Sequence, residues 1–177
     1  HSEIRFRWFG KFAIGISLAF LFVMVGSILL KGKSAFVSSD IAITIDLGPD
    51  NVDKNNINET RFDALVKKSL RQTFPNVKSR KEKKKLYGLL SSDMGFELRD
   101  QILNDTSILG SEATLWFTAS DDIDLLLKGA VDLSLDEDNR RISDLEVEWI
   151  SLLKDTNNVR TKFNKKFFTN GDSREPE

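Results

Sequence analysis

The feature that most constrains this chain is an uncharged apolar run near its N-terminus. Residues 12–30 read FAIGISLAFLFVMVGSILL, without a charged side chain and with only two serines. A helix over these 19 residues would extend about 28 Å, close to the roughly 30 Å hydrocarbon thickness of a bilayer. Signal-peptide apolar regions are usually only about 7–15 residues long and end in a small-x-small cleavage site, whereas this run leaves through LLKGKSAF. We expect a membrane anchor; a signal peptide and a buried helix of a soluble protein are the rivals.

The charged residues on either side of this run indicate its orientation in the membrane and separate an N-terminal part of the chain from a larger domain. Three basic residues precede the run and two follow it: Arg5, Arg7 and Lys11, then Lys31 and Lys33. Because cytoplasmic flanks carry the excess of Lys and Arg, we expect a cytoplasmic N-terminus. The predicted organisation is an N-terminal flank with a transmembrane helix in residues 1–33, followed by an extracytoplasmic domain in residues 34–177.

Composition restricts the chemistry of the domain. The chain has no Cys, and its single His is residue 1, which excludes thiolate sites, most zinc sites and most His-based acid–base catalysis. The chain has 26 basic and 27 acidic residues. Residues 1–33 hold five of the basic residues and one of the acidic residues, so the rest of the chain is acidic. This balance argues against nucleic-acid binding. We predict no catalytic residue, no cofactor and no metal site, and therefore no enzyme.

The domain sequence mixes strand and helix patterns. Apolar residues alternate in three segments: residues 41–47, 113–120 and 159–168. Helical spacing or capping signals mark five more: residues 61–74, 79–90, 93–103, 121–128 and 143–154. Strands separated by helices predict a small α+β domain, and the pattern leaves the strand order open.

Finer expectations concern caps and side-chain orientation. Ser79 with Glu82 and Ser143 with Glu146 have the spacing of capping boxes, and Ser120 is the expected cap of the helix over residues 121–128. In the last strand, the side chains predicted to face the core are Val159, Thr161, Phe163 and Phe167. Those predicted to face water are Arg160, Lys162 and Lys166. Trp116 and Trp149 are predicted core residues.

Three groups of residues are candidate sites. The run KSRKEKKK, with Lys83, Lys84 and Lys85, suits an anionic partner, and equally the wet face of an amphipathic helix. Ser173 and Arg174 in NGDSRE offer donors for an oxyanion, and are also ordinary loop residues. Asp121 and Asp122 resemble a carboxylate pair, but two acids in the first turn of a helix also complement its dipole.

Several motifs together resemble a known family. They occur in the order LLSS, LRDQIL, WFTASDDIDLLLKG, ISDLEVEWI and RTKFNKKFFTNGDSREPE, after an apolar helix that exits through KG. This order is similar to the N-terminal part of PstA-family permease subunits of bacterial phosphate ABC importers, in the version with a large extra domain. In that family GDSREPE resembles the lead-in to a second membrane helix.

The resemblance implies an inner-membrane protein whose domain is inserted between its first two membrane helices on the periplasmic side. It implies three protein partners: a second permease subunit, a cytoplasmic ATPase and a periplasmic phosphate-binding protein. Inorganic phosphate would be the substrate of the complex. No residue here matches the transport pathway or the ATPase-coupling loop, so the expected role of the domain is docking, assembly or regulation.

Two other classes remain open. A single-pass extracytoplasmic sensor or anchored assembly protein has the same layout of anchor and domain. A membrane-anchored hydrolase would need a carboxylate site built from residues such as Asp93, Glu97, Asp121 and Asp122.

Overall fold

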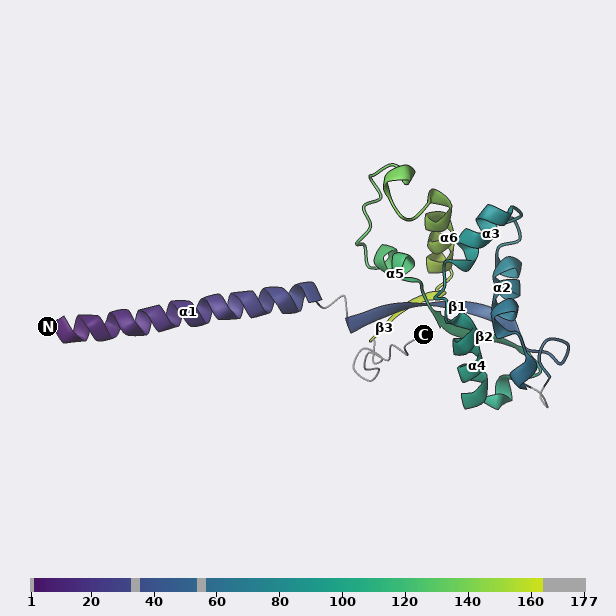
Figure 1. The fold of residues 1–177 in the computed structure, drawn as a ribbon, viewed down its shortest axis with the longest axis horizontal. Coiled ribbons are helices and arrows are strands. Elements are labelled where there is room, and N and C mark those ends of the chain that lie inside the picture. The colour runs from purple at the N-terminus through teal and green to yellow at the C-terminus, as the bar shows by residue number, and fades with distance from the viewer. Residues whose placement is uncertain (1, 33–35, 54–56, 164–177) are drawn as a thin grey trace, which may run out of the picture. The chain divides into compact units, whose positions relative to one another are not determined.

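The computed structural model describes residues 2–32, 36–53 and 57–163 (Figure 1). The chain forms two compact units: one holds His1–Val37 with Phe163–Glu177, and the other is Ser38–Lys162. The first unit contains helix α1, and the second contains the sheet and the remaining helices.

Helix α1 runs without interruption from Ser2 to Gly32. Its segment Arg7–Ile28, 22 residues, is long and apolar enough to cross a membrane, and none of it is buried within the protein. The sequence permits this helix because residues 2–32 contain no proline, the residue least compatible with a helix interior. The predicted apolar helix is therefore confirmed as a helix, and its length and composition suit a membrane span.

A small three-stranded sheet is the centre of the second unit. It consists of β1 (Val37–Asp46), β2 (Glu112–Thr118) and β3 (Val159–Phe163), in the order β2-β1-β3. β1 and β2 are antiparallel, in a register that pairs Asp40 with Thr118 and Asp46 with Glu112. β3 is also antiparallel to β1, because the Asn158 carbonyl accepts from Ala42 N–H while Arg160, further along β3, reaches back to Asp40.

Five helices accompany the sheet: α2 (Phe62–Thr73), α3 (Arg80–Tyr87), α4 (Met94–Asn104), α5 (Asp121–Leu127) and α6 (Asp144–Asp155). Short 3-10 turns occupy Ile57–Glu59, Thr106–Ile108 and Glu137–Asn139. The core combines one face of β1 and the residue that follows the strand with apolar residues of the helices: Ile41, Ile43, Ile45 and then Leu47, with Val66, Leu70, Leu98, Ile102 and Ile150. The predicted α+β class is confirmed.

Several finer expectations are wrong. Thr161 and Phe163 are exposed, because β3 lies at the edge of the sheet, where only Val159 packs against the core. Trp116 is half-buried on the polar face of the sheet, whereas Trp149 is a core residue as predicted. Ser120 occupies the N-cap position of α5 without a side-chain capping bond. Lys166 and Phe167 lie outside the described residues.

The capping box of α3 is present and has an electrostatic consequence. The Ser79 hydroxyl accepts from Glu82 N–H at 3.1 Å, and the Glu82 carboxylate accepts from Ser79 N–H at 3.2 Å. The backbone hydrogen bond from Ser79 and then its side-chain bond hold the pKa of Glu82 below its ordinary 4.5. Glu82 therefore stabilises the fold above the unfolded-state pKa, and this contribution disappears as the pH falls through the lower folded-state pKa.

We expect Glu82→Gln to reduce the free energy of unfolding at neutral pH, because the amide accepts the Ser79 N–H less strongly than the carboxylate does. The difference from wild type should shrink as the pH falls below about 4.5. Denaturant unfolding of the full chain in detergent micelles, followed by tryptophan fluorescence, measures both values. Glu148→Gln, on an exposed position of α6, is the control. A Glu82→Gln effect that does not change with pH would contradict this assignment.

Candidate functional site: a buried carboxylate between the first and last strands

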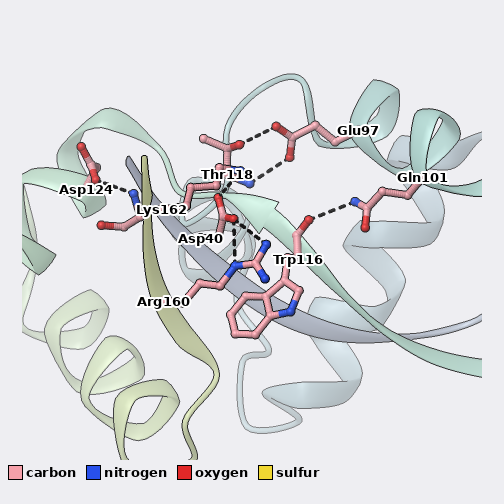
Figure 2. A network of polar contacts seen from close by, with 9 residues as sticks. Asp40, Glu97, Gln101, Trp116, Thr118, Asp124, Arg160 and Lys162 are labelled. Atoms are coloured by element: carbon pink, nitrogen blue, oxygen red, sulfur yellow. Dashed lines mark hydrogen bonds and ion pairs between the residues drawn. The ribbon is translucent and has the colours of Figure 1, made fainter. Parts of the chain in front are cut away.

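The polar face of the sheet contains a fully buried carboxylate. Asp40 of β1 has no exposed surface. Its Oδ2 accepts from Arg160 Nε at 3.2 Å and Nη2 at 3.1 Å, and its Oδ1 lies 2.7 Å from Lys162 Nζ. Figure 2 shows both cations reaching Asp40 from β3. We call Asp40, Arg160, Lys162 and Trp116 the Asp40 cluster.

Trp116 provides the apolar side of the Asp40 cluster. It lies opposite Ala42 in the sheet register, and the Arg160 guanidinium carbon lies 4.2 Å from the centre of its ring. This distance is within the range of a cation–π contact. The ring, the guanidinium and the carboxylate therefore hold one another in place across all three strands.

The chemistry available to the Asp40 cluster follows from its burial and charge. The carboxylate is enclosed and both of its oxygens face cations, so it has no open position for a substrate. The side chains of Arg160 and Lys162 are 47% and 42% exposed, so the cations present one excess positive charge to solvent. The arrangement is suited to joining two strands and offering a basic surface, and unsuited to acid–base catalysis.

A second polar contact fixes helix α5 to the start of β1. Ser39 N–H donates to Asp124 Oδ1 at 2.8 Å, and Asp124 Oδ2 forms an ion pair with Lys128 at 2.5 Å. Ser39 itself is buried. The end of the sheet at which the chain enters is thus held on two sides, by β3 through Asp40 and by α5 through Ser39.

The far edge of the sheet is covered by α4. Glu97 accepts from Thr118 N–H at 2.8 Å and from the Thr118 hydroxyl at 2.5 Å, and Gln101 Nε2 donates to the Trp116 carbonyl at 2.9 Å (Figure 2). These side chains satisfy backbone groups of the edge strand β2, which otherwise attract a foreign strand. Side chains of α4 therefore cover the edge of β2 at Trp116 and Thr118.

The sequence-predicted candidates have different outcomes. Lys83, Lys84 and Lys85 lie on α3, and Lys85 contacts Glu137 at 3.5 Å. Ser173 and Arg174 lie outside the described residues. These lysines are not part of the Asp40 cluster, and their role as partner contacts stays a prediction.

The carboxylates considered for a hydrolase do not form a metal site. Glu97 is bound to Thr118, and Asp122 contacts Arg141 at 3.6 Å. Within residues 2–32, 36–53 and 57–163, no group of three or more His, Asp or Glu side chains is placed to hold a metal ion.

Sequence reasoning missed the Asp40 cluster. The one local signal was a carboxylate directly before the apolar alternation of β1, at a position that a strand in the middle of a sheet buries. Its cations Arg160 and Lys162 lie 120 or more residues later in the chain. Both are exposed, as predicted, but they also reach back to pair with Asp40. Only the pairing of β3 with β1 brings these charges together.

We expect the double variant Arg160→Gln/Lys162→Gln to lose about 3 kcal/mol of unfolding free energy, because it leaves a buried carboxylate without a cation. Adding Asp40→Asn should restore more than half of that loss, since it removes the unpaired charge. Denaturant unfolding of the full chain in micelles measures the unfolding free energy of the wild type, of Asp40→Asn, of the double variant and of the three changes combined. The control is Lys67→Gln, which breaks the exposed ion pair with Asp63 and should cost about 1 kcal/mol or less. Additive effects of the Asp40 and β3 changes would contradict the account.

Comparison with known proteins gives one family. Residues 1–137 match the model of a domain of unknown function, DUF3333, a span that includes α1, β1 and β2 and ends before α6 and β3. No curated protein and no solved structure matches the chain. The matched span is more than half of the 177 residues, and the chain therefore belongs to the DUF3333 family.

Proposed function

We propose that this chain is the N-terminal part of an inner-membrane permease subunit of an ABC importer for inorganic phosphate. In this proposal α1 crosses the membrane with its N-terminus in the cytoplasm, and residues 34–177 form a periplasmic domain inserted before a second membrane helix. The domain acts in docking, assembly or regulation of the importer. The motif order that resembles PstA-family permeases and the membrane-length apolar segment of α1 support this proposal.

The observation that carries the proposal is the pairing of the first and last strands of the domain. β1, which follows α1 in sequence, is antiparallel to β3, so the chain enters and leaves the sheet at the same end. A domain built this way fits between two membrane helices without a long return connection. The Asp40 cluster strengthens this arrangement, because it joins the two strands close to that end.

The charges of the domain support a docking role. Arg160 and Lys162 place excess positive charge on the sheet, and Lys83, Lys84 and Lys85 extend along α3. A domain tethered to the permease raises the local concentration of its contact surface for a soluble binding protein. Such a surface needs only weak affinity for an acidic patch on that partner, and its contribution should fall with increasing salt.

We expect deletion of the gene that encodes this chain to abolish high-affinity uptake of radiolabelled phosphate, and the full-length gene to restore it. The triple variant Lys83→Glu/Lys84→Glu/Lys85→Glu should reduce uptake several-fold at equal membrane abundance, because reversed charge repels an acidic partner. The matched control is the triple replacement by Gln, which should have a smaller effect. Phosphate uptake that persists unchanged without the gene would contradict the proposal and favour a single-pass sensor or assembly protein.

A further inference from the structure

A cavity lies between the end of α2, the start of α3 and helix α6. Its volume is about 410 Å³, which is within the usual range for sites that bind small organic ligands. The residues that line it come from two stretches of the chain, 73–82 and 145–158, and both belong to the second unit. We call this hollow the Trp149 cavity.

Aromatic and aliphatic side chains form the inner wall of the Trp149 cavity. Phe74, just after α2, and Trp149, on α6, pack against each other with their ring centres 5.7 Å apart and their planes tilted by 48°. Both rings line the cavity and are otherwise buried, as are Val77 and Leu153. Such a wall accepts the apolar part of a ligand, and the face of an indole ring also attracts a cation.

The charged side chains that line the Trp149 cavity are both carboxylates, Glu82 and Glu148. Pro75 follows the end of α2, and the capping box begins α3 a few residues later, so Glu82 is fixed at the cavity by its bond from Ser79 N–H at 3.2 Å. Glu148 lies on an exposed position of α6. Within the described part of the chain, the Glu148 carboxylate has no hydrogen bond and no ion pair, so it is free to pair with a ligand.

This local charge is opposite to that of the neighbouring helix. Helix α3 carries five basic residues and one acidic residue, Glu82, and only that acidic residue lines the Trp149 cavity. An anionic ligand would bring its charge next to two carboxylates in a partly apolar site, which costs free energy. A cationic ligand would gain from the same two carboxylates and from the indole ring.

We propose that the Trp149 cavity binds a small organic cation, in which an ammonium or guanidinium group is attached to an apolar body. The apolar body lies against Phe74 and Trp149, and the cationic group pairs with Glu148 and Glu82. Because the lining residues belong to the second unit, the inference is independent of the proposed membrane insertion of α1. It adds a ligand site to the proposed transport role and does not rest on it.

Three probes of similar size and different charge test this assignment: phenethylamine, which is a cation at neutral pH, phenethyl alcohol, which is neutral, and phenylacetate, which is an anion. Each is titrated into the full chain in detergent micelles. Heteronuclear NMR follows the indole N–H resonances of the three tryptophans. The Trp149 resonance is the one that remains in both Trp8→Phe and Trp116→Phe. Trp8 lies in α1 and reports entry of a probe into the micelle separately.

We expect phenethylamine to shift the Trp149 resonance in a saturable way and to leave the Trp116 resonance in place. Phenethyl alcohol and phenylacetate should bind about threefold more weakly or less, because they lack the charge that pairs with the carboxylates. Saturable binding of phenylacetate with equal affinity would overturn the inference. A shift confined to Trp8, with no saturable shift at Trp149, would also overturn it.

Glu148→Gln tests the carboxylate directly. We expect it to weaken phenethylamine binding about threefold or more, because the amide carries no charge to pair with the ammonium group. The matched control is Asp155→Asn, which removes an exposed carboxylate of the same helix that does not line the cavity, and it should leave the affinity unchanged. Unaltered affinity in Glu148→Gln, or an equal loss in both variants, would overturn the inference.

Discussion

The ion pairing of Asp40 is the constraint on which the arrangement of this domain depends. A carboxylate without exposed surface is costly in a strand unless cations and hydrogen bonds compensate it. Here both cations come from β3, at the opposite end of the domain sequence. The sheet can therefore bury Asp40 only when its last strand is in place, and this links the start of the domain to its end.

This link gives the two sides of the sheet different properties. On the β2 side, Glu97 and Gln101 bind backbone groups of Thr118 and Trp116. On the β3 side, Arg160 and Lys162 leave positive charge at the surface, beside the point where the chain enters from α1 and where α5 is fixed through Asp124. A movement of the chain where it enters β1 or where it leaves β3 would act on the same Asp40 cluster. In the proposed function, this cluster would lie between two membrane segments and a partner that binds outside the membrane.

Local sequence patterns predicted those features that depend on local physics. The uncharged run predicted α1, alternation of Ile41, Ile43 and Ile45 predicted β1, and the spacing of Ser79 and Glu82 predicted the start of α3. The features that were missed depend on which segments meet in space. Trp116 was predicted in the core from its strand, but it alternates with Leu115 and Phe117 and so lies on the face of Asp40 and Arg160. Strand order, and with it the Asp40 cluster, requires tertiary information that periodicity does not contain.

The central claim is that α1 crosses the membrane once and holds the domain outside the cytoplasm, and cysteine accessibility tests it most directly. Single cysteines are placed at Glu3, before the apolar segment, and at Lys84, on an exposed position of α3, in the full-length protein. Intact cells are treated with a membrane-impermeant maleimide. The account predicts that position 84 is labelled in intact cells and that position 3 is labelled only after lysis. Labelling of position 3 but not of position 84 in intact cells, or protection of both positions until lysis, would contradict it.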